Sequence, residues 1–517
     1  MKTSGNLQEG KKRFLMNSFS GIAAQLTTAF VGLIIVSINL RFLGEELYSI
    51  VILAAAAINL LAILNLGLRP TLVRIFSKSL AEQNEEQLKT SLSTSLLFLG
   101  TLGMIGFLIL LCGIPTFLKL YAIPAEYAAS TEFLLICMGL SFLLNCLGVP
   151  YNGIASAAHR YDLVNVIIIV SYLTKSFSLL LFYIFFKPSL YYFGCAVLLG
   201  SLINYFALIA VCYREIGSNA FFRPRNVRLG IIPTFLALSL LMVLMTFFEG
   251  TCFTFPSLIL GVSLVEGVKV LGSAMIVAHN FEGMLARMVN ALTPLASQDS
   301  ANNEGKSLGR WAVLSSQLLT LFTALFLLVI IIWGKPALGL WLKPTLAEEV
   351  YFPLIILIAS LFCSPWGTFY LILGCRSVTT FCITVFWTTI LYFGVIWIGT
   401  CYYQWGIMEV VWSFALIRIL RDVGILLYDS SKKLNFSYFY CIFEAYIKPI
   451  LILFPFILIH AVINHFFQGK MTILFLTFYG LIIYWAFVFF CWKWLIPLEI
   501  RKQIIQKIPY IKKFVKV

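Results

Sequence analysis

The chain has 517 residues, of which 61% are hydrophobic and only 11% are charged. A soluble globular domain carries about 25% charged residues, so this composition excludes a soluble protein and predicts a polytopic α-helical membrane protein. The net charge of +15 then reflects basic cytoplasmic segments that face anionic lipid headgroups, and it does not indicate a nucleic-acid partner.

The first apolar run follows a basic cluster, Lys11, Lys12 and Arg13, and lasts to about Leu40. It is too long for the core of a signal peptide, and no A-x-A cleavage site follows it. We therefore expect a first membrane helix here.

Hydropathy predicts fourteen membrane helices in all. Their approximate spans are 14–40, 47–68, 90–114, 128–150, 164–186, 190–213, 230–256, 262–292, 311–334, 351–374, 378–400, 407–428, 447–467 and 471–494. The segment from Pro70 to Lys89 is amphipathic, with Leu72 and Phe76 on its apolar side, and is expected to lie in the membrane interface.

Lysine and arginine are distributed unevenly between the two sides of these helices. The side of the N-terminus holds 27 of them and the opposite side holds seven, while Lys175, Arg287 and Arg418 fall inside predicted helices. Positive charge is retained in the cytoplasm, so both termini are predicted to be cytoplasmic.

A weak internal symmetry divides the chain. Each half has a proline-containing connection after its second helix, at Pro70 and at Pro294. Such symmetry is typical of transporters. We expect an N-terminal lobe at 1–213, a basic linker at 214–229, a C-terminal lobe at 230–428, two further helices within 429–494 and a basic tail at 495–517.

The most informative stretch runs from Val265 to Pro294. Glu266, Lys269, Ser273, Asn280 and Arg287 fall within about 60° of arc when it is projected as a helix. Charge in hydrocarbon is costly, so this stripe is expected to line a cavity. Two alternatives remain: an ion pair between Glu266 and Lys269, and an Arg287 that reaches the lipid headgroups.

Uncharged polar stripes occur on other helices. The first helix carries Asn17, Gln25, Gly32 and Asn39 within about 80°. These residues either line a cavity or mediate ordinary helix packing, because small and polar side chains do both in membranes.

Two isolated charges are harder to attribute to packing. Lys175 flanks a narrow face of the fifth helix that includes Tyr172 and Tyr183, and Glu249 lies in the seventh helix. Lone charges in membrane helices indicate a function by default.

Motifs for catalysis are weak. Gly305-Lys306-Ser307 lacks the first glycine of a phosphate-binding loop, and His460 and His465 have the wrong spacing for a zinc pair on one helical face. The sequence therefore predicts neither an enzyme nor a cofactor or metal site.

Several segments resemble bacterial polysaccharide-biosynthesis membrane proteins, the O-antigen (Wzx-type) flippases of the superfamily that includes multidrug and toxin extrusion transporters. The matching segments are Arg41-Phe-Leu-Gly44 with Tyr48, Leu64–Leu68, Arg74, Leu80–Asn84, Gly153–Asn165, Asn290–Pro294 and Leu340–Leu342. The resemblance extends over roughly residues 10 to 428, and Asn65 stands where the family often has Asp. The last two helices exceed the commoner twelve, as in the related peptidoglycan-precursor flippases.

The resemblance implies two six-helix lobes around a central cavity, alternating access, and an oligosaccharide substrate on an undecaprenyl diphosphate carrier. Charge and position suggest Lys175, Lys269 and Arg287 as partners of the diphosphate. They also suggest Glu249, Glu266 and Glu282 as carriers of a coupling H⁺ or Na⁺. Asn17, Gln25, Ser273 and Asn280 are candidate polar residues of the cavity, and other polysaccharide-assembly proteins are candidate partners.

Two other functions stay open. A multidrug or organic-cation antiporter of the same fold would have acidic residues dominating its cavity. A membrane polymerase or ligase would need a large external loop, and no predicted external loop exceeds about 20 residues.

Overall fold

A computed structural model describes residues 27–28, 30–61, 68–158, 160–289, 305–375, 378–466 and 473–494. Every element in these ranges is a helix, as the composition predicts. Within the described ranges, eight helices are long and apolar enough to cross a membrane, and Phe30–Phe42, Phe247–Ser263 and Phe475–Cys491 are shorter apolar helices. The chain is a multi-pass membrane protein, while the count of fourteen crossings stays a prediction.

The helices form two compact units. The first comprises residues up to Val277 together with Val385–Val410, and the second comprises Ala278–Thr384 and the residues from Val411 onward. The predicted lobe boundary at 214–229 stays a prediction.

The first unit contains the helix Phe30–Phe42 and most of the N-terminal elements. They are α2 (Glu45–Leu61), α3 (Arg69–Ala81), α4 (Glu85–Leu120), α5 (Ala125–Ala157), α6 (Tyr161–Phe185), α7 (Leu190–Ile216), the short 3₁₀ turns η2 (Gly217–Ala220), η3 (Pro224–Asn226) and η4 (Leu229–Ile231), α8 (Ile232–Thr251) and α9 (Phe255–Ser263).

Three helices are divided between the units. They are α10 (Val265–Val289), α15 (Thr379–Tyr402) and α16 (Ile407–Ile419), whose first residues up to Val410 belong to the first unit. The second unit adds α12 (Gly305–Trp341), α13 (Pro344–Ser360), η5 (Leu361–Cys363), α14 (Trp366–Cys375), most of α16 (Ile407–Ile419), the π-helix η6 (Leu420–Leu427), α17 (Tyr428–Leu434), α18 (Tyr438–Cys441), the π-helix η7 (Ile442–Ile447), α19 (Lys448–Phe466) and α20 (Ile473–Trp494).

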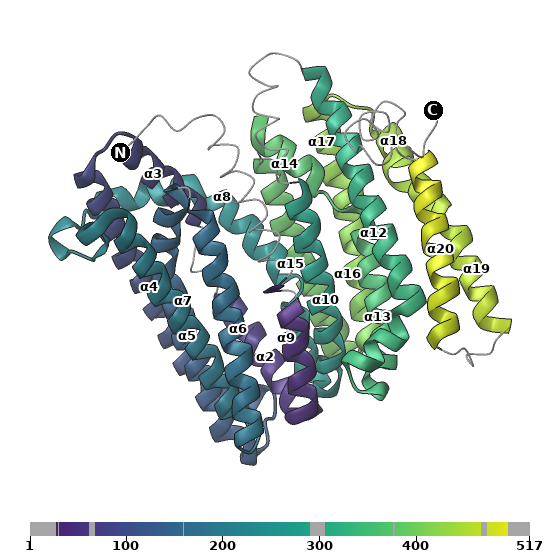
Figure 1. Cartoon of the computed structure of the whole chain (residues 1–517), viewed down its shortest axis with the longest axis horizontal. Coiled ribbons are helices and arrows are strands. Elements are labelled where there is room, and N and C mark those ends of the chain that lie inside the picture. The colour runs from purple at the N-terminus through teal and green to yellow at the C-terminus, as the bar shows by residue number, and fades with distance from the viewer. Residues whose placement is uncertain are drawn as a thin grey trace. The chain divides into compact units, whose positions relative to one another are not determined.

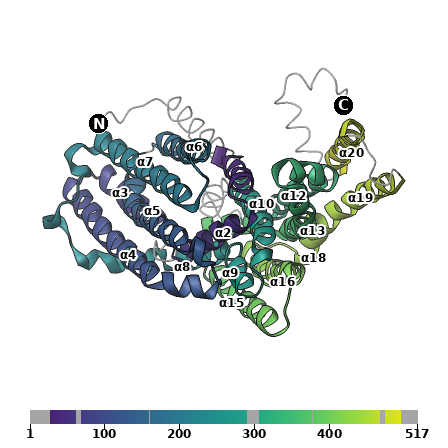
Figure 2. The same ribbon diagram turned by 90° about the horizontal axis from the view of Figure 1, so that it is seen from below.

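In the first unit, α4, α5 and α7 run side by side (Figures 1 and 2). Small residues allow this close packing: a Cβ on Gly103 of α4 would lie only 2.9 Å from the Cβ of Cys146 on α5. Small residues at contacts are typical of membrane helices, where lipid supplies no hydrophobic drive for association.

The segment predicted to be amphipathic, Pro70 to Lys89, forms the helix α3 and the start of α4, while its location in the membrane interface stays a prediction. Its apolar residues Leu72 and Phe76 are fully buried and pack with Tyr151 and Ile154 of α5. Protein, and not lipid, therefore covers the apolar face of α3.

Two predicted spans differ from the observed helices at prolines. The expected helix 351–374 is divided, because Ser364 leaves the helical conformation (ψ 124°) before Pro365, and α14 begins at Trp366. The expected break between Pro256 and Gly261 is absent, because both residues lie in α9, with Pro256 in its first turn; the chain leaves the helix on either side, at 252–254 and at Leu264.

In the second unit, α19 and α20 pack against each other and against α12, as Figure 2 shows. These two helices correspond to the predicted spans 447–467 and 471–494.

Candidate functional site

Two adjoining cavities lie within the first unit, and both include Lys175 of α6. One has a volume of about 390 Å³ and is enclosed by α2, α5, α6 and α7. The other, of about 340 Å³, lies among the helix Phe30–Phe42, α2, α6, α9 and α10. Asn59, Tyr172 and Lys175 line both cavities and form the wall between them.

The Lys175 ammonium has an aromatic neighbour. It lies 5.5 Å from the centre of the Phe193 ring. In the residues that the structure describes, no carboxylate forms an ion pair with it, and neither cavity is lined by Asp or Glu. Lys175 is half-buried. A lysine at the centre of a membrane helix costs about 2.5–3.5 kcal/mol or more, and a cation–π contact returns roughly 0.5–2 kcal/mol. The site thus favours an anionic ligand.

Gly200 of α7 allows the close approach of α6 at this point. A Cβ on Gly200 would lie 3.1 Å from the Lys175 Cβ and 3.1 Å from the Ser171 carbonyl oxygen. Gly200 itself lines the first cavity, so its missing side chain helps to fix the position of Lys175.

The predicted polar stripes of the first and fifth helices meet at the second cavity. Tyr183 on α6 donates a 3.0 Å hydrogen bond to the Asn39 side chain, and both residues are buried. Asn39 and Gly32 line the cavity, as does Tyr172. The predicted cavity residues Asn17 and Gln25 of the same stripe lie outside the described residues.

The first part of the α10 stripe belongs to the first unit. Lys269 forms an ion pair with Glu45 at the start of α2, and not with Glu266, whose side chain is exposed. Ser273 is fully buried beside Tyr48, while its neighbours Gly272 and Ile276 line the second cavity. The stripe therefore borders the cavity, with Lys269 already neutralised.

The remaining stripe residues lie in the second unit. Asn280 is half-buried and Arg287 is exposed close to the end of α10. Glu249 of α8, in the first unit, is 7% exposed and does not line either cavity. The structure thus does not bring the three predicted cations together, and of the three only Lys175 lines the two described cavities.

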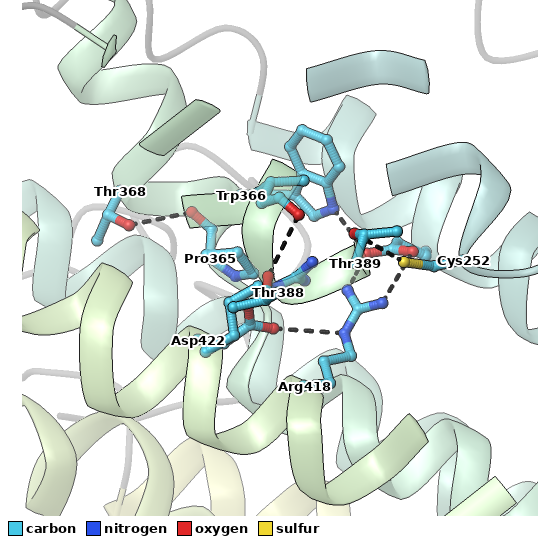
Figure 3. A network of polar contacts seen from close by, with 11 residues as sticks. Cys252, Pro365, Trp366, Thr368, Thr388, Thr389, Arg418 and Asp422 are labelled. Atoms are coloured by element: carbon cyan, nitrogen blue, oxygen red, sulfur yellow. Dashed lines mark hydrogen bonds and ion pairs between the residues drawn. The ribbon is translucent and has the colours of Figure 1, made fainter. Parts of the chain in front are cut away.

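Glu282 belongs to a buried ionic cluster in the second unit. It forms an ion pair with Arg418, and the Trp366 indole N–H donates a 3.1 Å hydrogen bond to it. Arg418 also pairs with Asp422 at 3.3 Å (Figure 3), and the Arg421 Nε donates a 2.6 Å hydrogen bond to the same carboxylate. Two arginines thus balance two carboxylates.

The cluster depends on irregular backbone. Asp422 and Arg421 lie on the π-helix η6, and Trp366 is the first residue of α14 after the Pro365 break. π-Helical turns within longer helices are frequent at functional sites.

Sequence reasoning did not single out Glu45, Arg421 or Asp422. Glu45 follows a predicted helix end, and its partner lies 224 residues away. Arg421 and Asp422 lie near the predicted cytoplasmic end of a span. The spacing of Arg418 and Asp422 could have indicated this ion pair, since charges four residues apart on a helix are neighbours.

A model of the polysaccharide biosynthesis protein family matches residues 14–276, just over half of the chain. Among proteins with curated functions, none matches the sequence significantly.

Solved transporter structures share the fold. An inward-closed structure of the lipid II flippase MurJ matches with a TM-score of 0.69 and 13% identity, over 93% of this chain and all of that chain. An inward-facing multidrug resistance MATE family transporter matches with a TM-score of 0.68 and 13% identity, over 81% and 98%. A MOP superfamily transporter from Pyrococcus furiosus matches with a TM-score of 0.57 and 13% identity, over 84% and 99%. The chain therefore has a MOP-superfamily transporter fold.

Proposed function

The chain belongs to the polysaccharide biosynthesis protein family, and we propose that it is a flippase for lipid-linked oligosaccharides. The proposed substrate is an oligosaccharide on undecaprenyl diphosphate, a precursor of O-antigen, capsule or exopolysaccharide. It would move from the cytoplasmic to the outer leaflet of the bacterial inner membrane by alternating access.

The observation that carries the proposal is the environment of Lys175. Its ammonium lies in the wall between two cavities whose other polar groups are neutral amides and hydroxyls. A diphosphate supplies the missing negative charge, and charge-assisted hydrogen bonds to an ammonium are about twice as strong as neutral ones. Amides and hydroxyls are natural partners of sugar hydroxyls.

The organisation of the transporter is part of the proposal. We expect lobes at 1–213 and 230–428 joined by the basic linker 214–229, with cytoplasmic termini and a basic tail at 495–517. The two helices within 429–494 are an addition to these lobes. Other polysaccharide-assembly proteins are proposed as partners in the membrane.

Export would be coupled to H⁺ or Na⁺. Of the three proposed carriers, Glu282 is balanced by Arg418, and Glu266 is exposed. Glu249 combines a carboxylate with burial in the first unit. We therefore place the coupling role on Glu249 first.

The alternative is a multidrug or organic-cation antiporter, because a multidrug transporter shares the fold. That function requires an acidic cavity, whereas the two described cavities contain a cation and no Asp or Glu. An organic cation would meet a like charge at Lys175, which disfavours this function.

The test is a deletion strain carrying either the wild-type chain or Lys175→Met. Deletion should make a lipid-linked glycan accumulate on the cytoplasmic leaflet and remove the corresponding surface polysaccharide. Lys175→Met should restore little export and Lys175→Arg a substantial part, because Arg keeps the charge. Lys187→Met is the matched control, since Lys187 is exposed at the end of the same helix.

Normal surface polysaccharide with Lys175→Met at normal abundance would contradict the role of this cavity. Unchanged glycan but raised sensitivity to cationic drugs in the deletion strain would favour the antiporter.

A further inference from the structure

The two cavities that meet at Lys175 differ in the chemistry of their walls. Both are lined by α2, α6 and α7, the larger also by α5, and the smaller also by the helix Phe30–Phe42, α9 and α10. Their shared wall contains the cation, one amide (Asn59) and one phenol (Tyr172). The difference therefore lies in the residues that the two cavities do not share.

The larger cavity is rich in free hydrogen-bonding groups. Asn145 and Asn204 contribute amides that hydrogen-bond to no other described residue, and Ser201 adds a hydroxyl from α7. Asn145 is exposed and Asn204 is half-buried, so both amides are accessible within the cavity. Each amide offers two donors and an acceptor, which matches the alternating donors and acceptors of a sugar ring.

The smaller cavity has mainly hydrocarbon on its unshared wall. Ile35, Val36, Val51, Ile52, Phe193 and Phe253 all contribute to it, beside the three hydroxyl-bearing residues Tyr48, Thr254 and Ser257. Its one unshared amide, Asn39, already accepts the hydrogen bond of Tyr183. Such a wall favours an apolar ligand, at about 25 cal/mol for each Å² of apolar surface buried.

Neither cavity is large enough for a whole lipid-linked oligosaccharide. Their volumes of about 390 and 340 Å³ lie at the lower end of the range for small-ligand sites, about 300–1,000 Å³. Each cavity can take one part of a long substrate, and an anion at Lys175 would lie between the two parts.

We propose that the cavities hold the two sides of one amphiphile, with the first sugar in the larger cavity, the first isoprene units in the smaller one, and the diphosphate at Lys175. This inference rests on the proposed flippase function. It adds an orientation of the substrate: the sugar lies toward α5, and the lipid lies toward the helix Phe30–Phe42 and α9. Recognition then requires the junction of sugar, anion and lipid and not the whole glycan.

The test measures binding of three probes to the purified full-length chain in detergent by calorimetry. Inorganic pyrophosphate carries the anion alone, glucose 1-diphosphate adds a sugar, and farnesyl diphosphate adds isoprene units. Asn204→Leu removes an amide from the larger cavity, and Ala55→Leu fills part of the smaller one, which Ala55 lines. Asn226→Leu is the control, because η3 lies outside both cavities.

We expect Asn204→Leu to lower the affinity for glucose 1-diphosphate roughly tenfold and to leave the affinities for the other two probes unchanged. Ala55→Leu should lower the affinity for farnesyl diphosphate roughly tenfold and leave the affinity for glucose 1-diphosphate unchanged. If Ala55→Leu does not fold, Val36→Thr tests the same wall, because it adds a hydroxyl at similar volume.

The failures of the two proposals can be distinguished. In one outcome all three probes bind, and Lys175→Met lowers the affinity for each of them. If the cavity variants then affect the sugar and isoprene probes alike, or in the reverse order, the proposed orientation of the substrate is wrong and the anion site stands. If pyrophosphate does not bind, or binds equally to Lys175→Met, the anion site itself is wrong, and the proposed function loses its main support.

Discussion

Arg418 on α16 forms an ion pair with Glu282 on α10, and the two side chains are only 3% and 4% exposed. The pair ties the second half of α10 to α16 within the second unit. Asp422 and Arg421 complete the cluster, so the four formal charges cancel. A buried cluster that is balanced in this way is sensitive to the loss of any one charge.

Removing Arg418 alone should destabilise the protein strongly. We expect Arg418→Met to lower the free energy of unfolding by about 3–5 kcal/mol, because Glu282 keeps a buried, uncompensated charge. The double variant Arg418→Met/Glu282→Gln should recover most of this loss, since Arg421 and Asp422 still balance and the introduced amide keeps an acceptor for the Trp366 indole. Unfolding in detergent, followed as a double-mutant cycle, gives the coupling energy. If the effects of Arg418→Met and Glu282→Gln on the free energy of unfolding simply add in the double variant, the two residues do not form a stabilising pair.

Glu249 provides a test of ion coupling. Glu249→Gln should abolish the response of transport to an imposed H⁺ or Na⁺ gradient in proteoliposomes, because the amide takes up no proton at neutral pH and offers Na⁺ no negative charge. Glu249→Asp should retain part of the response. Glu266→Gln serves as the control, since Glu266 is exposed. Gradient-dependent transport by Glu249→Gln would assign the coupling to another group.

Gly200 should be intolerant of even one methyl group. Gly200→Ala places a Cβ 3.1 Å from the Cβ of Lys175, so α6 or α7 has to shift at the proposed anion site. Overpacking costs about 1–3 kcal/mol and offsets the roughly 1 kcal/mol that alanine gains over glycine in a helix. The midpoint of thermal unfolding and pyrophosphate affinity should both fall. Gly113→Ala, which meets nothing within 4 Å, should instead raise the midpoint.

Much of the helical architecture could be predicted from the sequence. Hydropathy depends on local composition, so the spans fall on helices wherever the chain is described, for example α6 at Tyr161–Phe185 against the expected 164–186. The interruption at Pro365 was not predicted, because the flanking segments are equally apolar and hydropathy does not register a change of backbone direction.

The candidate site could be predicted only in part. Helical projection indicated the faces of Asn39, Tyr172 and Tyr183; Asn39 and Tyr172 line the smaller cavity with Lys175, and Tyr183 hydrogen-bonds to Asn39. The same projection could not identify Glu45 as the partner of Lys269, because the pairing depends on how distant helices pack. Periodicity shows which residues share a face, but not what that face contacts.

The predicted topology can be tested by cysteine labelling in a cysteine-free background. Single cysteines at Lys119 and Lys335 should react with a membrane-impermeant reagent in intact cells, and one at Lys432 should not. All three positions are exposed, so burial does not limit their reactivity. A third external position, Lys470, lies outside the described residues. The reverse labelling pattern would contradict the cytoplasmic assignment of both termini.

The role of Arg287 separates the cavity and headgroup interpretations of the α10 stripe. Lys269 and Arg287 lie 18 residues apart, which is about 27 Å along one helix, so they cannot hold one diphosphate together. Lys269 is paired with Glu45, whereas Arg287 is exposed in the last turn of α10. A cation in the last turn is stabilised by the negative end of the helix dipole.

If Arg287 meets the diphosphate while the cavity opens inward, export should fall in a graded series. Arg287→Lys should be mild because it keeps the charge, Arg287→Ala should be more severe, and Arg287→Glu should abolish export by presenting a like charge to the diphosphate. Surface polysaccharide in the deletion strain is the measurement, with abundance checked by blot. Arg310→Glu is the control, since Arg310 is exposed near the start of α12. Normal export by Arg287→Glu at normal abundance would show that Arg287 is a headgroup anchor. Lys175 would then be the remaining candidate for the diphosphate, since of the three proposed cations only Lys175 lines the described cavities.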